Sequence, residues 1–441
     1  MKTVKKMIAL LVVFALLLCT AACGANESAQ PSGNPGTTTK APETDPPAPR
    51  KVQAADLLEA FTARQVEDKA TDDTFTAAAF DWAAKLFSQV YAGEGEQKTL
   101  LVSPLSVLIA LAMTANGAKG ETLKEMEQVL GGLGIDDLNA YLRTYLKSLP
   151  SSELAKFAFA NAIWFKDDPD FLVEDEFLQK VVDYYDAAVR KAPFDETTVQ
   201  EINQWVALHT DDMIEKLLEE LKDSDRMVLV NALVFDAKWQ VPFLEEECRE
   251  DVFTGLDGRK GTATFMSQEI HSYIESDEAI GFTKSYKDDT YRFVALLPKD
   301  EEGFEDFVKG LTGEKLAALI NSENGDRTII RMPKFSYDYD TSLVSVLEAM
   351  GMKKAFTDRA DFSGISTTEA VCIGDVLHKT HIDLDSEGTR AAAVTAVMML
   401  SATAVMQPPH RVTLDRPFVY MIVDSATNLP VFMGTVTGFG E

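Results

Sequence analysis

The sequence predicts an α+β fold, and three observations lead to that prediction. Two near-continuous apolar runs, FAFANAIWF at 157–165 and MVLVNALVF at 227–235, are typical of central strands. Amphipathic helical segments lie before and between them. Strands and helices do not alternate regularly along the chain, which disfavours a doubly wound fold and favours a domain with more than one large sheet.

Helices are expected mainly in the first half of the folded chain. Residues 72–92 carry four apolar side chains on one side at helical spacing, namely Phe75, Ala79, Trp82 and Leu86. Ser103 caps a helix with Pro104 at its first position, and after a break at Gly117 a second, short helix begins near Glu121. A further helix is expected over 202–218, with four side chains inward: Ile202, Trp205, Ile214 and Leu217. Further strand signals follow at 292–298, 327–337, 411–424 and 431–438.

The composition limits the class of protein. A length of 441 residues would by itself suggest two or three domains, but the landmarks argue for one. Hydrophobic residues make up 46% of the chain, enough for a large core, which excludes global disorder. The net charge of -28 argues against nucleic acid as a partner, because phosphate binding requires clustered Lys and Arg.

The N-terminus predicts export. Residues 1–23 form a signal peptide, with lysines before an apolar core that is too short to span a membrane comfortably. Ala21 and Ala22 before Cys23 are typical of a bacterial lipobox, which implies lipidation of Cys23; ordinary secretory cleavage after Ala22 is the alternative. The mature protein is expected at the cell surface as a lipoprotein, or secreted. Residues 24–51, rich in Pro and Thr, predict a disordered tether, and 52–441 the folded domain.

No motif for catalysis or metal binding is found in the sequence. HExxH, GxSxG, P-loop and CxxC patterns are absent, so neither an enzyme nor a metal or other cofactor is expected. His378 and His381 have the spacing of two ligands on a helix face, but in their strand-like context they face opposite sides. Outside the signal, two cysteines remain as free thiols, Cys248 and Cys372.

The segment DLDSEGTRAAAVTAVMMLSATAVMQPPHR at 383–411 is unusual in a chain whose residues are 25% charged. It could open a helix or form an aggregation-prone edge, but it lacks the two faces of an amphipathic helix. Read with period two, it predicts a strand whose buried face holds only small or apolar residues: Thr389, Ala391, Ala393, Thr395, Val397 and Met399. Gly388 provides a flexible entry, and the prolines at 408–409 a stop.

These landmarks, taken in order, resemble the serpin family over residues 56–441. The matching stretches are SPLSVLIALAMTANGAKGET, ANAIWF, INQWV, LVNALVFDAKWQVPF, MPKFSYDYDTSLVSVLEAMGMKKAF, ADFSGIS, VLHKTHIDLDSEGTRAAAVTAV and DRPFVYMIVDSATNLPVFMGTV. The resemblance implies a single domain with three β-sheets, about nine helices and an exposed reactive-centre loop.

The resemblance also implies a function. The protein is expected to inhibit serine endopeptidases irreversibly as a suicide substrate, acting as a monomer, with cysteine proteases as second targets. The protease cuts the loop and stays bound as a covalent acyl complex while the loop inserts as a new strand into the central sheet. The alternative is a non-inhibitory serpin that acts as a surface binding or scaffold protein, whose loop would be cut as a plain substrate.

The resemblance assigns residues to the loop. Its hinge comprises Gly388, Thr389, Arg390, Ala391, Ala392, Ala393, Val394 and Thr395. Counting the family's usual spacing forward from Gly388 puts the reactive bond at Ala402–Thr403. Counting back from the family motif at Pro417–Phe418 puts it at Met406–Gln407. The residue just before the reactive bond, called P1, is uncharged at every candidate position. This implies an elastase-like or subtilisin-like target protease, because a trypsin-like protease requires Arg or Lys at P1.

Two further sites are carried over from the family. The shutter, whose polar groups hold two strands together until they part, matches Ser103, Ser106, Asn231 and His378. The breach, where the loop enters the sheet, matches Trp239 and Lys334. The family usually has Glu where Ser386 stands, paired with the breach lysine, and only Asp385 or Glu387 is expected to substitute. The family also favours Glu at Arg390, which faces outward and should not block insertion.

Overall fold

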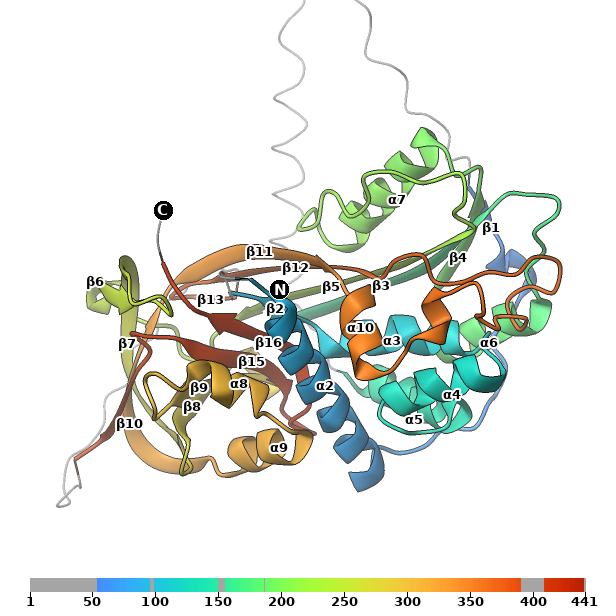
Figure 1. Ribbon diagram of the computed structural model, residues 1–441. Coiled ribbons are helices and arrows are strands. Elements are labelled where there is room, and N and C mark those ends of the chain that lie inside the picture. The colour runs from blue at the N-terminus through green and yellow to red at the C-terminus, as the bar shows by residue number, and fades with distance from the viewer. Residues whose placement is uncertain (1–53, 96–98, 150–154, 186, 390–407, 440–441) are drawn as a thin grey trace, which may run out of the picture. The chain divides into compact units, whose positions relative to one another are not determined.

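Nine α-helices and three β-sheets make up the described part of the chain, in the mixed α+β fold that the sequence predicts (Figure 1). The structure is a computed structural model and describes residues 54–95, 99–149, 155–185, 187–389 and 408–439. The chain divides into two units, Met1–Lys51 and Val52–Glu441, and every described residue belongs to the second. The predicted signal peptide and the whole of the predicted tether lie outside the described residues.

A seven-stranded sheet, called the central sheet below, contains both predicted apolar runs. Its order is β1 (Ala55–Asp56), β4 (Ala188–Ala192), β3 (Ala155–Lys166), β5 (Met227–Lys238), β13 (Gly388–Thr389), β12 (Leu377–Leu384) and β11 (Phe335–Ser342). The runs form β3 and β5, which pair antiparallel from Ala155 with Ala237 to Phe165 with Met227. β13, of which two residues are described, lies between β5 and β12 and pairs antiparallel with both.

The other two sheets share the long strand β7 (Lys260–Glu275), which pairs with β6 and β10 along most of its length and with β8 at its end. The path runs β14-β10-β7-β8-β9-β15-β16-β2, with β6 beside β7. The bounds are β2 (Leu101–Val102), β6 (Arg249–Thr254), β8 (Ala279–Ser285), β9 (Tyr291–Pro298), β10 (Asn324–Pro333), β14 (His410–Thr413), β15 (Phe418–Asp424) and β16 (Pro430–Val436).

The helix predicted at Ser103 begins there, and side chains also cap other helices. Asp72 caps the first by accepting from the backbone N–H groups of Thr74 and Phe75, and Ser103 caps the next with Pro104 at its first position. The helices are α2 (Asp73–Gly93), α3 (Pro104–Ala115), α4 (Gly120–Val129), α5 (Ile135–Ser148), α6 (Asp175–Tyr185), α7 (Glu196–His209), α8 (Phe304–Lys309), α9 (Gly313–Asn321) and α10 (Val344–Met350). None of the described helices is long and apolar enough to cross a membrane.

The helix predicted over 202–218 is shorter than expected. α7 ends at His209, and Asp211 and Asp212 adopt positive φ values of 49° and 59°, which an α-helix does not allow. Ile214 is nevertheless buried, in a cluster with Ile202 and with residues of β3 and β5. The apolar spacing therefore arises from a loop that folds back onto the central sheet, and the helical prediction beyond His209 is wrong.

The strand predicted over 327–337 is two strands. β10 ends at Pro333 and β11 begins at Phe335, so the chain passes from one sheet to the central sheet at Lys334. Both strands have a buried face, and their alternation alone does not reveal the change of sheet. The change of sheet places Lys334 beside the predicted entry point of the loop.

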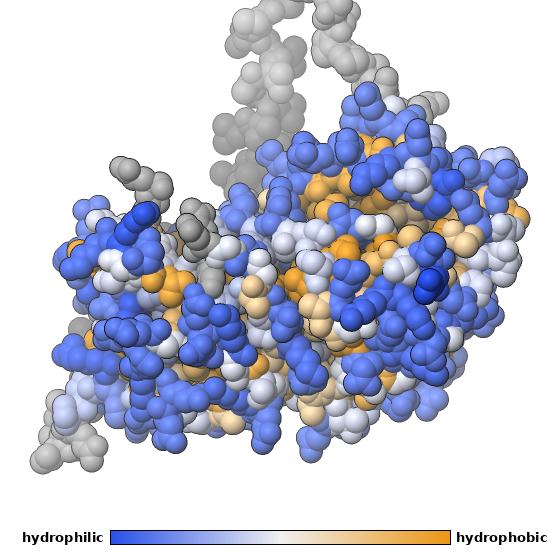
Figure 2. All heavy atoms as spheres, viewed as in Figure 1, coloured by the Kyte–Doolittle hydropathy of each residue, from blue (hydrophilic) through white to orange (hydrophobic). Residues whose placement is uncertain are grey.

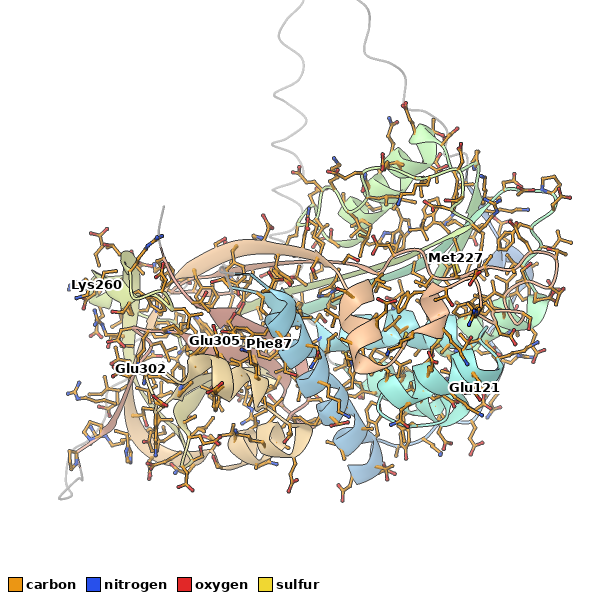
Figure 3. All side chains as sticks on the ribbon, viewed as in Figure 1. Phe87, Glu121, Met227, Lys260, Glu302 and Glu305 are labelled. Atoms are coloured by element: carbon orange, nitrogen blue, oxygen red, sulfur yellow. The ribbon has the colours of Figure 1, made fainter. Side chains whose placement is uncertain are left out.

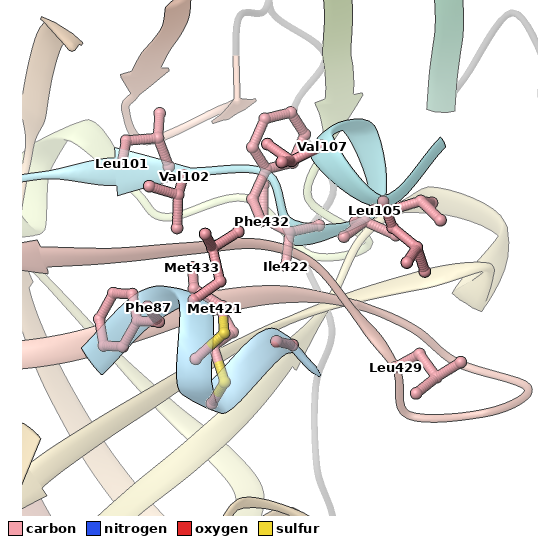
Figure 4. Close-up of a cluster of buried hydrophobic side chains, with 14 of the residues drawn as sticks. Phe87, Leu101, Val102, Leu105, Val107, Met421, Ile422, Leu429, Phe432 and Met433 are labelled. Atoms are coloured by element: carbon pink, nitrogen blue, oxygen red, sulfur yellow. The ribbon is translucent and has the colours of Figure 1, made fainter. Parts of the chain in front are cut away.

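The core packs between the sheets and the helices. α3 lies against β5 on one face of the central sheet, and α7 covers β3 and β5 on the other (Figure 1). Figure 4 shows part of the main cluster, in which Phe87 of α2 and Leu105 of α3 lie close to side chains of β2, β15 and β16. Glu121, Lys260 and Glu302 are exposed (Figure 3), and hydrophilic residues cover most of the visible face (Figure 2). This surface is consistent with the acidic composition.

Candidate functional site

The start of the predicted hinge already lies in the central sheet. Gly388 pairs with Lys238 of β5, and Thr389 pairs with Ala237 of β5 and Leu384 of β12. The rest of the hinge (Arg390, Ala391, Ala392, Ala393, Val394, Thr395) and both candidate reactive bonds (Ala402–Thr403, Met406–Gln407) lie outside the described residues. The chain resumes at Pro408 and enters β14, which pairs parallel with β10.

Gly388 allows a close approach to β5. A Cβ atom at this position would lie 2.2 Å from the carbonyl oxygen of Ala237 and 2.7 Å from the Cα of Lys238. These distances are far below van der Waals contact, and both neighbours belong to the backbone of a paired strand. Glycine is therefore required here for steric reasons, in addition to the flexibility that the sequence indicates.

Thr389 is buried, with 3% of its surface exposed. Its Oγ1 lies 2.8 Å from the hydroxyl of Tyr286, which is itself fully buried. The two hydroxyl groups satisfy each other in a site that offers little water. The side chain thus lies on the inward face that period-two reading assigns to it.

The turn before the hinge is held by its own backbone and by the segment that follows β5. The Asp385 carboxylate accepts from the backbone N–H groups of Glu387 (2.7 Å) and Gly388 (3.1 Å). Trp239 donates its backbone N–H to Glu387 O (2.8 Å) and its indole N–H to Asp385 O (2.9 Å). Phe243 donates its backbone N–H to Ser386 O (2.9 Å). Segment 239–243 therefore acts as a clamp on turn 385–387.

The predicted breach residues Trp239 and Lys334 both lie at this turn. Trp239 is fully buried and stacks on Tyr286 with ring centroids 4.5 Å apart. Lys334 donates to Glu245 Oε1 (2.8 Å) and to Ser386 Oγ (3.2 Å), and Ser386 in turn donates to Glu245. The three side chains form one connected polar group.

The partner expected for Lys334 is wrong. Neither Asp385 nor Glu387 provides the bonded carboxylate; Glu245 does, from the short 3-10 helix Glu245–Glu247, 141 residues before Ser386. Lys334 and the Ser386 hydroxyl lower the pKa of Glu245, so it remains ionised. Burial is the strongest single influence on the pKa of Lys334 and works to lower it, but the bond to Glu245 and the neighbouring negative groups together outweigh burial, and the pKa is raised. The sequence feature that could have indicated Glu245 is the acidic run at 245–247, which follows the motif that contains Trp239.

The predicted shutter residues lie at the junction of α3 with β12. The backbone N–H of Ser103 donates to His378 Nε2 (3.0 Å), and its hydroxyl donates to Val431 O (2.8 Å) while capping Ser106 N (3.2 Å). Thr380, two residues along β12, donates to Leu101 O (2.8 Å), a contact that motif reasoning missed. The backbone of Asn231 pairs with Asn161, but its side chain lies outside the described residues. The structure thus brings Ser103, Ser106 and His378 together.

A comparison with known families identifies the protein class. A family model described as serpin (serine protease inhibitor) matches residues 77–438. The chain belongs to the serpin family. Serpins are in general inhibitors of serine proteases rather than enzymes.

Relatives of this serpin span its whole domain. It is 29% identical over 432 residues to an uncharacterized serpin-like protein of Thermococcus kodakarensis, with 96% of this chain and 97% of that protein covered. Neuroserpin of Homo sapiens is 28% identical over 401 residues, covering 86% of this chain and 96% of neuroserpin.

Two solved structures of a thermophilic serpin match most of this chain. The thermophilic serpin tengpin in its native state matches with a TM-score of 0.83 at 42% identity, covering 88% of this chain and 100% of that one. Tengpin in its latent state matches with a TM-score of 0.75 at 39% identity, covering 85% and 100%.

A small pocket in this serpin lies between β5 and β12, next to the hinge. Its lining comprises Leu233 and Phe235 of β5, His381 and Asp383 of β12, Thr389, and Met213 and Ile214 from the loop after α7. In the described part of the chain, β5 and β12 are connected through β13 alone and no ladder joins them directly. An extension of β13 beyond Thr389 would have these two strands as its neighbours.

The two histidines of β12 do not form a metal site. His378 is buried, whereas His381 faces the other side and its Nδ1 lies 2.9 Å from Asp338 Oδ1. Among the described residues, no group of three or more His, Cys, Asp and Glu side chains could hold a metal ion. Cys248 and Cys372 are free thiols.

Acid should weaken the shutter through His378. Burial lowers the pKa of His378 to about 4, from a usual value of 6.5. The neutral, buried His378 therefore makes its full contribution to the free energy of unfolding above pH 6.5. That contribution, at most about 3 kcal/mol, is lost as the pH falls towards 4. Urea unfolding at pH 7, 6, 5 and 4 should show a smaller loss for His378→Gln than for the wild type.

His381→Gln is the matched control for this experiment. It alters a half-buried histidine on the other face of the same strand, away from Ser103, and should keep the loss of stability in acid that is assigned to His378. Equal acid dependence of His378→Gln and the wild type would refute the role assigned to His378.

Proposed function

We propose that this serpin inhibits serine endopeptidases of elastase-like or subtilisin-like specificity, with cysteine proteases as second targets. The observation that carries the proposal is β13, because the first two hinge residues already lie in register between β5 and β12. Continuing that strand requires only further pairing along the same two neighbours.

The proposed mechanism couples cleavage to insertion. The hydroxyl of the target's serine attacks the carbonyl carbon of the P1 residue, the peptide bond to P1′ breaks, and the new amine leaves with residues C-terminal to it. P1 remains joined to the protease as an ester. The freed N-terminal part of the loop then extends β13, and alternation along a strand puts Ala391, Ala393 and Thr395 on the same face as buried Thr389. Small side chains on that face allow the strand to fit.

The predicted target class follows from the residues around the reactive bond. The side chains available as P1 are all uncharged: Met399, Leu400, Ala402, Val405 and Met406. A trypsin-like protease uses an acidic pocket that these residues cannot pair with. Elastase-like and subtilisin-like proteases accept small or medium apolar residues.

The decisive experiment mixes the protein with an elastase and with trypsin. An adduct with elastase that survives SDS, together with little adduct with trypsin, is the expected result. Cleavage of the loop by elastase without an adduct would contradict inhibition. That outcome would favour the alternative, a non-inhibitory serpin that acts as a binding or scaffold protein.

We also propose that Cys23 anchors the protein as an exported lipoprotein. Cys23→Ala should abolish incorporation of a labelled fatty acid and release the protein from the membrane fraction, because the thiol is the site of lipidation. Cys19→Ala is the control, since Cys19 lies within the signal and should be dispensable for labelling. A wild type without label would mean ordinary secretory cleavage after Ala22.

A further inference from the structure

Lys284 of β8 is buried beneath the clamp on the hinge turn. Only 5% of its surface is exposed, and among the described residues it is the only buried lysine or arginine. Its ammonium donates to the carbonyl oxygen of Val241 (2.7 Å) and to the side-chain oxygen of Gln268. The same ammonium lies 5.3 Å from the ring centroid of Trp239 and 4.5 Å from that of Phe243.

These contacts place the ammonium directly against segment 239–243, the clamp described above. Gln268 of β7 strengthens the arrangement by donating to Pro242 O (3.1 Å). The opposite edge of the same segment donates the N–H groups of Trp239 and Phe243 to the turn at 385–387. Segment 239–243 thus contacts both the hinge turn and Lys284, and moving it away would remove the contacts that help to bury the ammonium.

A buried ammonium without a carboxylate partner destabilises the closed arrangement. Ring faces and neutral oxygens compensate only part of the lost hydration. The titratable groups on the surrounding elements have other partners: Tyr286 bonds Thr389, Glu245 bonds Lys334, the Asp385 carboxylate accepts from Glu387 and Gly388, and Cys248 contacts Leu244 O. No ion pair with Lys284 is present among the described residues.

We propose that Lys284 is a positioning residue that links proton uptake to release of the hinge turn. When its amine is neutral, segment 239–243 stays closed over it and holds the turn. When the amine is charged, opening the segment restores its hydration, so the clamp opens more readily. The inference deepens the proposed function, because the hinge turn is where insertion would begin.

The direction of the pH effect follows from burial. Burial lowers the pKa of Lys284 to about 7, from a usual value of 10.5 that solvent would restore on opening. Between these pH values the open form holds one more proton than the closed form. The closed form is therefore favoured as pH rises above 7, by about tenfold per pH unit at most, and the balance is nearly constant well below pH 7.

Hydrogen exchange of the backbone N–H groups of Trp239 and Phe243 tests the proposal on the full chain without any protease. Rates measured from pH 5.5 to 8.5 and divided by the intrinsic rate at each pH yield protection factors. In the wild type these should be constant at the acidic end and rise roughly 30-fold by pH 8.5. Lys284→Met, which keeps a long apolar side chain without the charge, should give protection that does not depend on pH.

Lys315→Met is the matched control. Lys315 also lies over an aromatic ring, 5.4 Å from the centroid of Phe307, but it is paired with Glu278. That variant should keep the pH profile of the wild type. A profile of the wild type without pH dependence would overturn the proposal even if Lys284→Met did not fold, and so would a pH-dependent profile of Lys284→Met. Either result would leave the elastase adduct, and with it the proposed function, unaffected.

Discussion

Thr389→Arg should turn the proposed inhibitor into a plain substrate of its target protease. Thr389 is 3% exposed, lies between β5 and β12, and bonds Tyr286. An arginine there must either bury an unpaired charge or remain outside the sheet, and the first costs several kcal/mol. A penalty of about 3 kcal/mol slows insertion by about 100-fold, long enough for the protease to hydrolyse the acyl bond and escape.

The measurement is the yield of SDS-resistant adduct with elastase, together with the yield of cleaved, released inhibitor. Thr389→Ser is the control, because it keeps the hydroxyl that Tyr286 bonds and adds no bulk. Its adduct yield should match that of the wild type. An unchanged adduct yield for Thr389→Arg would remove insertion of the hinge from the proposed mechanism.

Ala402→Arg should redirect inhibition towards trypsin. Arginine at P1 would pair with the acidic pocket of trypsin, where the uncharged wild-type residues leave that pocket unpaired. A pocket built to bind a polar group discriminates strongly, so the rate of adduct formation with trypsin should rise by on the order of 100-fold or more.

Mass spectrometry of the C-terminal fragment from the elastase complex fixes the register independently. A fragment that begins at Thr403 is expected. One that begins at Gln407 would move P1 to Met406, and Met406→Arg would then be the variant that redirects inhibition. Efficient trapping of trypsin by the wild type would refute the specificity argument in either register.

The sequence predicts correctly those elements whose signal is local. The runs at 157–165 and 227–235 form β3 and β5 because strands at the centre of a sheet are apolar on both faces. α3 begins where Ser103 and Pro104 indicate, because capping depends on adjacent residues. The helical prediction beyond His209 is wrong because apolar spacing reports burial, and a loop packed on a sheet can have the same spacing as a helix.

The features of the site also divide into those that the local sequence predicts and those that it does not. The inward position of Thr389 and the need for glycine at 388 follow from strand alternation and from the entry of a strand, both properties of a short segment. The carboxylate that pairs with Lys334 is Glu245, which sequence proximity to Ser386 does not indicate. Glu245 lies 89 residues before Lys334 and 141 before Ser386, so it is selected by the packing of strands, and a single sequence does not show that these residues meet.

By itself, then, the sequence determined the strands at the centre of the sheet, the helix cap at Ser103, the inward position of Thr389 and the membership of the serpin family. Only the tertiary structure decided that β10 and β11 part at Lys334, that Glu245 completes the breach, and that Lys284 is buried beneath Trp239. Secondary structure depends on residues a few positions apart. The burial and charge state of a lysine depend on every element packed around it, and these meet only in the folded chain.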